Sequence, residues 1–228
     1  MTLIEVAEDR LLLSLSDGSS LEVPRAVMPG QFLAWQSGSR LALFEKLARE
    51  GASSVKQHPA HLPVLATIGD GLFPINLATR GIGLLPLPER LEECTGNLEA
   101  AHRKTGELSW AESLPRRLEA AKAVYGDPAV FDPRLLGGLE IFEGRTAANL
   151  EERPLASLLF SGEPPDYPSL QLNGVMQRIG PGDPRFQFFL AARQLFAYDA
   201  FHIPQGRYPY GYVFHVSEVL DKTPFPRG

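Results

Sequence analysis

The stretch LEIFEGRTAANLEERPLASLLFS, residues 139–161, decides how the fold of this chain is interpreted. Leu139–Glu143 and Leu155–Ser161 have the apolar, strand-like composition of sheet segments. Between them a Gly-Arg-Thr turn at 144–146 opens a short helical segment, and Pro154 separates this segment from the second strand. The stretch therefore predicts a strand, a turn, a short helix and a buried strand.

The Gly-Arg-Thr turn is also the main candidate for chemistry. Free N–H groups at the start of a helix, with the Arg145 guanidinium and the Thr146 hydroxyl beside them, offer donors to a phosphate or a carboxylate. A structural alternative uses the same residues: Thr146 caps the turn and Arg145 forms an ion pair with Glu143, Glu151 or Glu152. The residues alone leave both interpretations open.

Strand and helix patterns extend on both sides of this stretch. Asp17-Gly18 and Gly69-Asp70-Gly71 are typical of hairpin turns, and Pro, Gly and Asp at 126–138 indicate a joint. Ser109 and Glu112 form a capping box, and Asp183-Pro184 is a helix start. The further expected strands are 3–6, 10–16, 19–23, 62–68, 73–78, 169–179 and 210–220, and the expected helices are 39–50, two within 87–125, and 184–197.

Composition excludes several classes of protein. The net charge is −5, the sequence pI is about 5.6 and there is no Lys/Arg run, which argues against binding of a nucleic-acid backbone. No stretch approaches the roughly 18 apolar residues of a membrane span, and the N-terminus lacks a signal-peptide pattern, so we expect a cytoplasmic protein. Cys94 is the single cysteine, which excludes an intramolecular disulfide, and no metal-binding motif is present.

Four segments resemble one known family. GRTAANLEERPLASLLF is similar to the segment "strand, basic or hydroxyl turn, Asn-Leu, Pro, buried strand" of the pyridoxamine 5′-phosphate oxidase-like split β-barrel proteins, which mostly bind FMN. VLATIGDGLFPINLAT resembles the opening hairpin of that family, SLQLNGVMQRIGPGDPRFQFFLAARQLF a later strand and helix, and YGYVFHVSEVLDKTP the closing strand. The chain departs from the family in two ways: two helices stand where the family has a short link, and Asn76 stands where many members have Arg.

The resemblance implies a fold of the α+β class. We expect an antiparallel split β-barrel with flanking helices over residues 61–228, interrupted by a helical insertion at about 84–134. Residues 1–60 would form a β-hairpin and helix extension in front of the barrel.

The resemblance also implies a homodimer that binds FMN at the subunit interface, and hence a possible FMN-dependent oxidoreductase. Arg145 and Thr146 would hold the phosphate, and Thr67 and Asn76 would lie beside the flavin ring. Gln171 and Asn173 alternate with leucines, share one face of their strand and would contact the ring or the ribityl chain. As catalytic candidates, His202 and Tyr208 would face the substrate.

Two other functions remain open. In the first, the barrel is a non-catalytic module whose extension and inserted helices cover the cofactor groove and serve a protein partner. In the second, the chain binds haem through His202 or His215.

Overall fold

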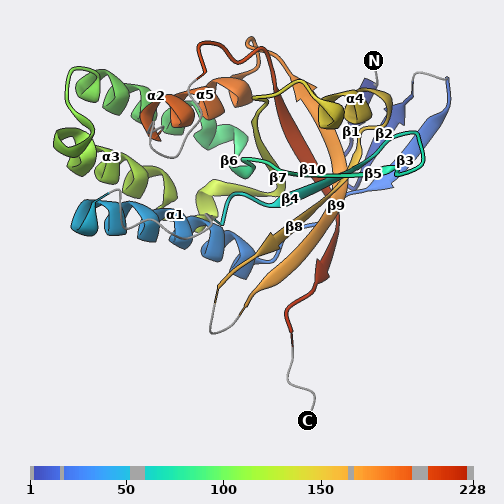
Figure 1. The fold of residues 1–228 in the computed structure, drawn as a ribbon, viewed down its shortest axis with the longest axis horizontal. Helices are drawn as coiled ribbons and strands as arrows, with labels where there is room; N and C mark the ends of the chain where they lie inside the picture. Colours follow the sequence, from blue (N-terminus) through green and yellow to red (C-terminus); the bar gives the residue numbers. More distant parts are fainter. Residues whose placement is uncertain (1–2, 16–17, 52–59, 164–166, 197–204, 225–228) are drawn as a thin grey trace.

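The computed structural model describes residues 3–15, 18–51, 60–163, 167–196 and 205–224 (Figure 1). The described strands are β1 (Leu3–Val6), β2 (Arg10–Ser14), β3 (Ser20–Pro24), β4 (Val64–Ile68), β5 (Ile75–Thr79), β6 (Gly83–Pro86), β7 (Phe131–Leu139), β8 (Leu155–Ser161), β9 (Ser169–Ile179) and β10 (Gly211–Asp221). The helices are α1 (Gly30–Glu50), α2 (Pro88–Thr105), α3 (Trp110–Tyr125), α4 (Arg145–Glu152) and α5 (Pro184–Phe196), with a short 3-10 turn, η2, at Pro128–Val130.

Seven strands form an antiparallel sheet that curls on itself. Their order is β5-β4-β8-β9-β10-β7-β6, so β5 and β6 are the two ends of the sheet. These ends are consecutive in the chain and are separated only by residues 80–82. The Arg80 N–H donates to the Pro63 carbonyl at 3.2 Å, and the Ile82 N–H donates to the His61 carbonyl at 3.0 Å. The link between β5 and β6 is therefore held against the residues before β4, which brings β6 back to the β4–β5 end of the sheet. The expected α+β class with an antiparallel split barrel is confirmed.

Strand β7 corrects two predictions from the sequence. The expected joint at 126–138 is largely strand, and the expected strand at 139–143 is wrong because β7 ends at Leu139. Glycine explains the error: a Cβ on Gly138 would lie 2.0 Å from the Gly81 carbonyl oxygen, and one on Gly137 would lie 2.4 Å from that of Tyr212. Residues that normally interrupt strands are here required by the close approach of neighbouring backbones.

A second, smaller sheet lies against the outside of the barrel. β1, β2 and β3 form an antiparallel meander in which Leu11 and Leu13 are fully buried. These leucines pack against Val175 on β9 and Leu155 on β8. The N-terminal strands thus gain the apolar partner surface that so small a sheet requires.

The other side of the barrel is covered by helices. α1, α2, α3 and α5 lie together at one end of the molecule, whereas α4 stands apart above β4 and β5 (Figure 1). Phe32 on α1 meets Phe160 on β8 edge to face with ring centroids 5.0 Å apart. α1 begins at Gly30, nine residues earlier than the sequence predicts, because Phe32 and Leu33 extend its buried face.

No helix within the described residues is both long enough and apolar enough to cross a membrane.

Candidate functional site

The first turn of α4 has unused hydrogen-bond donors. Its N-cap is Gly144, no side chain caps the helix, and Thr146 lies inside it. The alternative in which Thr146 caps the turn is therefore wrong. The backbone N–H groups of Arg145, Thr146 and Ala147 have no backbone acceptor among the described residues. Such a turn attracts anions because the N–H dipoles point outward.

One face of α4 is fastened to β4 and β5 by a cluster of hydroxyl and amide groups. The Thr67 Oγ1 accepts from the Nδ2 atoms of Asn76, at 3.3 Å, and Asn149, at 3.1 Å. The Asn76 amide also donates to the Thr146 Oγ1 at 3.0 Å. Thr67, Thr146 and Asn149 are at least nine-tenths buried. The structure thus brings three of the predicted cofactor residues together, but it satisfies them with one another.

Asn149 is the member of this cluster that we did not assign from the sequence. It follows Thr146 by three residues, which places both side chains on one face of a helix. A Cβ added at Gly69 would lie 2.3 Å from the Asn149 Oδ1. The turn between β4 and β5 therefore needs glycine at 69 to accommodate Asn149.

Arg145 is exposed and forms no hydrogen bond or ion pair with any other described residue. Glu151, one of its expected partners, instead lies 3.8 Å from Arg178. The guanidinium of Arg145 is consequently available to a ligand at the first turn of α4.

The second face of α4 borders a cleft of about 680 Å³. This volume lies within the roughly 300–1,000 Å³ range of small-molecule sites. Gly144, Ala147 and Ala148 form one wall of the cleft, and their small side chains leave that wall flat. The opposite wall comes from the end of β9 and the start of β10.

That opposite wall carries a stacked pair of side chains. The Arg178 guanidinium lies over the Tyr210 ring, 3.7 Å from its centroid, and the rings of Tyr210 and Tyr212 meet edge to face at 5.5 Å. Burial raises the pKa of both tyrosine hydroxyls, so both remain protonated near neutral pH. The wall therefore offers a flat cationic and aromatic surface with hydroxyl donors nearby.

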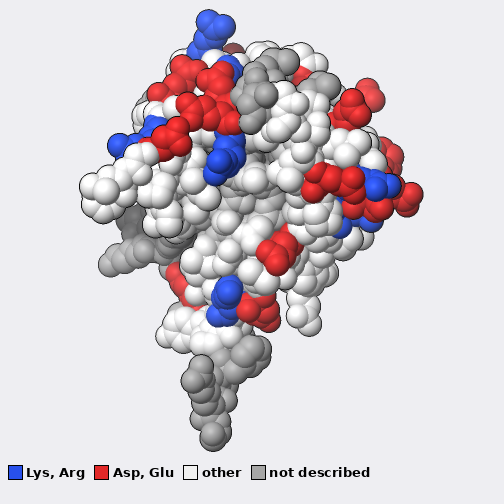
Figure 2. Space-filling model, turned by 90° about the vertical axis from the view of Figure 1, so that its right-hand side faces the viewer, with Lys and Arg blue, Asp and Glu red and all other residues white. Residues whose placement is uncertain are grey.

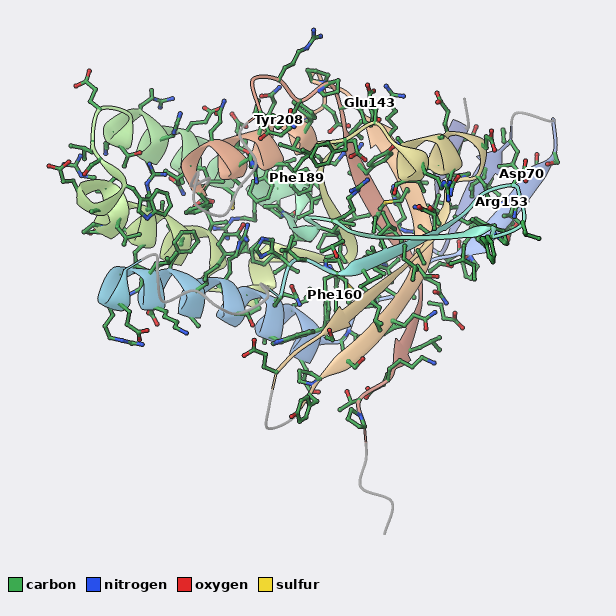
Figure 3. All side chains as sticks on the ribbon, viewed as in Figure 1. Asp70, Glu143, Arg153, Phe160, Phe189 and Tyr208 are labelled. Carbon is green, nitrogen blue, oxygen red and sulfur yellow. The ribbon has the colours of Figure 1, made fainter. Side chains whose placement is uncertain are left out.

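Charge is unevenly distributed around the cleft. Glu143 and Glu151 line it, and both carboxylates oppose an anion. Figure 3 shows Glu143 beside the start of α4, with Arg153 near its other end. Gly144 lines the cleft, whereas Arg145 is exposed next to it and is not among the lining residues. Arg145 and the first-turn N–H groups favour an anion, so the phosphate-compatible place is the edge of the cleft at the first turn of α4.

Gln171 and Asn173 lie away from the α4 cluster. Asn173 is paired with Ser157 across β8 and β9, whereas Thr67 is paired with Ala156, so the two polar sets lie on opposite faces of the sheet. The Asn173 Oδ1 accepts from the Ser157 hydroxyl at 2.7 Å and from the Gln171 amide at 2.9 Å. These residues belong to the outer surface of the barrel.

The two catalytic candidates do not meet in the cleft. Tyr208 accepts a hydrogen bond from the Arg193 Nε at 2.9 Å and packs against the main core, outside the residues that line the cleft. His202 lies outside the described residues. Tyr210 lines the cleft instead. The Tyr-Pro-Tyr-Gly-Tyr run at 208–212 is the sequence signal that could have indicated it as a candidate.

His215 is 1% exposed and lies behind the cleft on β10. Burial, with Arg185 and Arg25 nearby, lowers its pKa to about 4. Its Nε2 lies 3.0 Å from the Gln177 Oε1, and its Nδ1 is buried without a hydrogen-bond partner among the described residues, so the ring presents no exposed nitrogen to a haem iron.

The described residues contain no group of three or more His, Cys, Asp and Glu side chains that could hold a metal. Cys94 is buried, and burial raises the pKa of its thiol, which argues against a nucleophilic role.

The inserted helices do not cover the cleft. α2 packs against α5 and α3, and α3 packs against α1, in the helical layer remote from α4 (Figure 1). From the N-terminal extension, Ile4 on β1 lines the cleft. The extension, rather than the insertion, borders this site.

Comparison with known proteins finds no matching family model and no matching curated protein. Among solved structures, the chain is similar to HupZ of Group A Streptococcus at 13% identity, covering 71% of this chain and 85% of that chain with a TM-score of 0.39. It is also similar to an FMN-binding protein from Syntrophomonas wolfei subsp. wolfei at 10% identity, covering 86% of this chain and 94% of that chain with a TM-score of 0.41. At these values the comparison assigns no residue of this chain to a site.

Proposed function

We propose that this chain binds a phosphate-bearing redox cofactor of the FMN type in the cleft beside α4. The observation that carries the proposal is a small-molecule-sized cleft beside a helix start whose N–H groups, like the neighbouring Arg145, have no hydrogen-bond partner among the described residues. In this proposal the phosphate lies at the first turn of α4, where the charge is favourable.

The walls of the cleft suit a planar ring. Ala147 and Ala148 are small enough to let a ring approach α4, and the Arg178–Tyr210 pair offers a flat surface opposite them. A bound flavin would supply the hydride chemistry of an oxidoreductase, while the protein binds and orients it. Thr67 and Thr146 contribute by holding α4 in place rather than by touching the ring.

Titration of the purified protein with FMN, followed by flavin absorption and fluorescence, tests the proposal. Arg145→Ala should weaken FMN binding by roughly 10-fold to 100-fold, since a charge-assisted hydrogen bond contributes about 1.5–3 kcal/mol. Arg153→Ala, at the other end of the same helix, is the matched control and should bind as the wild type does. Absence of flavin binding, or equal affinities for Arg145→Ala and wild type, would overturn the proposal.

We also propose that the chain forms a homodimer through the uncovered outer face of β4, β5 and β8. This face and the adjacent turn expose a group of large apolar side chains: Val64, Ile68, Leu72, Phe73, Ile75, Leu77 and Leu159 are 38–88% exposed. Figure 2 shows a largely uncharged middle on the side that carries the β4–β5 hairpin. An apolar surface of this kind is typical of an interface, and a two-fold axis would bring the same face from both copies together.

Sedimentation velocity over a range of protein concentrations tests the dimer. Leu77→Lys should shift the protein to the monomer because it places a charge on the apolar face. Leu12→Lys, on an exposed position of β2, is the control and should leave association unchanged. A wild-type monomer at all concentrations would contradict this proposal and leave the same face to a different protein partner.

A further inference from the structure

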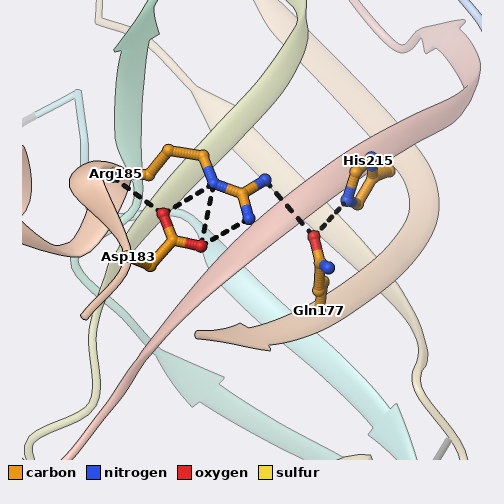
Figure 4. A network of polar contacts seen from close by, with 4 residues as sticks. All are labelled: Gln177, Asp183, Arg185 and His215. Atoms are coloured by element: carbon orange, nitrogen blue, oxygen red, sulfur yellow. Dashed lines mark hydrogen bonds and ion pairs between the residues drawn. The ribbon is translucent and has the colours of Figure 1, made fainter. Parts of the chain in front are cut away.

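A chain of four polar side chains runs from the surface to the interior behind the cleft (Figure 4). Asp183 binds Arg185, Arg185 reaches Gln177, and Gln177 meets His215. Gln177 also lines the cleft. The role of Gln177 rests on the proposed function, since it concerns the ligand of the same cleft.

The orientation of the Gln177 amide follows from the chemistry of its neighbours. The Arg185 Nη1 lies 3.3 Å from one atom of the amide, and the His215 Nε2 lies 3.0 Å from the same atom. A guanidinium can only donate, so that atom must be the carbonyl oxygen, Oε1. The His215 Nε2 must then carry a hydrogen and donate as well. Two donors therefore fix the amide in one orientation.

Both donors are themselves held in place. The Asp183 carboxylate accepts from the Arg185 Nε at 2.9 Å and from its Nη2 at 2.6 Å. Although burial acts to raise the pKa of Asp183, the hydrogen bonds and charge of Arg185 lower it overall, so the pair stays ionised. His215 is enclosed on β10, and its low pKa keeps the ring neutral. Its imidazole can therefore keep a single tautomer with the hydrogen on Nε2.

The other half of the Gln177 amide has no partner in the part of the chain that the structure describes. Its Nε2 forms no hydrogen bond with any described residue, although its Oε1 accepts two. Side-chain amides carry two N–H donors on this nitrogen. Gln177 lines the cleft from β9, where its side chain leaves the face opposite to that of Arg178 and Tyr212. With the oxygen engaged by Arg185 and His215, the amide nitrogen is the half of the group that is left for a ligand.

We propose that Gln177 determines ligand specificity by donating its amide N–H groups to a carbonyl oxygen or ring nitrogen at the edge of a planar ligand. His215 and Arg185 are positioning residues that act through Gln177. The ligand class is therefore a heteroaromatic ring with acceptor atoms on its edge. A ring without such acceptors leaves the amide unpaired, and a site that pairs a polar ligand edge discriminates strongly against analogues that lack it.

The test uses lumichrome, a tricyclic ring that has edge carbonyl groups and no phosphate. In ¹⁵N-labelled protein, the Gln177 side-chain N–H resonances should shift when lumichrome is added. Gln177→Met, which keeps the length and removes the donors, should weaken lumichrome binding by about 10-fold. If this variant does not fold, the shift in the wild-type protein decides alone.

Substitution of His215 separates positioning from mere packing. Gln at 215 keeps a donor that can reach the Gln177 Oε1, whereas Leu removes it. His215→Gln should therefore retain lumichrome affinity within about 3-fold, and His215→Leu should lose it by about 10-fold, as Gln177→Met does. Equal affinities for the two variants would remove His215 from the proposal.

The results also separate this inference from the proposed function. A lumichrome-induced shift at Gln177 in a protein that does not bind FMN would support the inference and overturn the phosphate site. FMN binding without a shift at Gln177, and with equal affinity in Gln177→Met, would overturn the inference and leave the phosphate site standing. Absence of both would overturn both.

Discussion

The polar groups on the two sides of α4 differ in whether their hydrogen bonds are satisfied within the protein. Toward β4 and β5, Thr67, Asn76, Thr146 and Asn149 are hydrogen-bonded to one another. Toward the cleft, the first-turn N–H groups and the amide nitrogen of Gln177 have no partner among the described residues. Polar residues gathered in a buried place can thus be structural, whereas donors left over at a concave surface indicate binding.

The two sides of α4 also differ in what their hydrogen bonds hold in place. The hydrogen-bonded cluster of Thr67, Asn76, Thr146 and Asn149, called the closed cluster here, holds α4 against the β4–β5 hairpin. Substitutions in it should therefore mainly lower the free energy of unfolding. On the cleft side, Asp183, Arg185 and His215 fix the Gln177 amide. Substitutions in this chain of residues should therefore mainly change ligand binding and the dependence of stability on pH.

Acid should have the largest effect, and it acts on the cleft side. The pKa of His215 is about 4 in the folded protein and about 6.5 in an unfolded chain, so below pH 6.5 the unfolded state binds the proton first. The free energy of unfolding should therefore fall by about 3 kcal/mol between pH 6.5 and pH 4 through this residue alone. Urea unfolding at a series of pH values measures it, with His215→Gln as the variant that lacks the titration. Parallel pH curves for the two proteins would contradict the assignment.

Thr67→Val tests the closed cluster. It removes the acceptor shared by the amides of Asn76 and Asn149 and leaves two donors unpaired in a largely buried place. We expect a loss of about 2 kcal/mol in the free energy of unfolding. Thr79→Val, at an exposed position of β5, is the matched control and should change stability by less than about 0.5 kcal/mol. Equal losses in the two variants would show that the cluster does not stabilise the attachment of α4.

Glu151→Gln should have the smallest effect on stability and a distinct effect on binding. Its ion pair with Arg178 spans 3.8 Å between side chains that are more than half exposed, so unfolding should change by less than about 0.5 kcal/mol. Removing one carboxylate from the cleft should raise FMN affinity by roughly 3-fold to 10-fold. Glu152→Gln, the next residue along α4 and outside the cleft, is the control in the same titration. A rise of the same size in both variants would indicate a general effect of net charge.

Local signals in the sequence predicted many elements well. β8 and β9 have the predicted bounds, and the Ser109–Glu112 capping box is present at the start of α3. The errors occur where distant residues decide: β7 keeps its glycines because Gly81 and Tyr212 approach it. Propensity rules see only neighbours in the chain, so they cannot account for such an approach.

The sequence by itself determined that Arg145 and Thr146 open a short helix after a glycine, and that Thr67 and Asn76 lie on a hairpin. It also determined that Gln171 and Asn173 share a face, because side chains alternate along a strand. Only the tertiary structure decided that this face is the outer one, that Thr146 is buried where α4 packs on β4 and β5, and that Gly144 and Gln177 line one cleft. The physical reason is that sheet register and helix docking depend on long-range pairing, which local sequence does not encode.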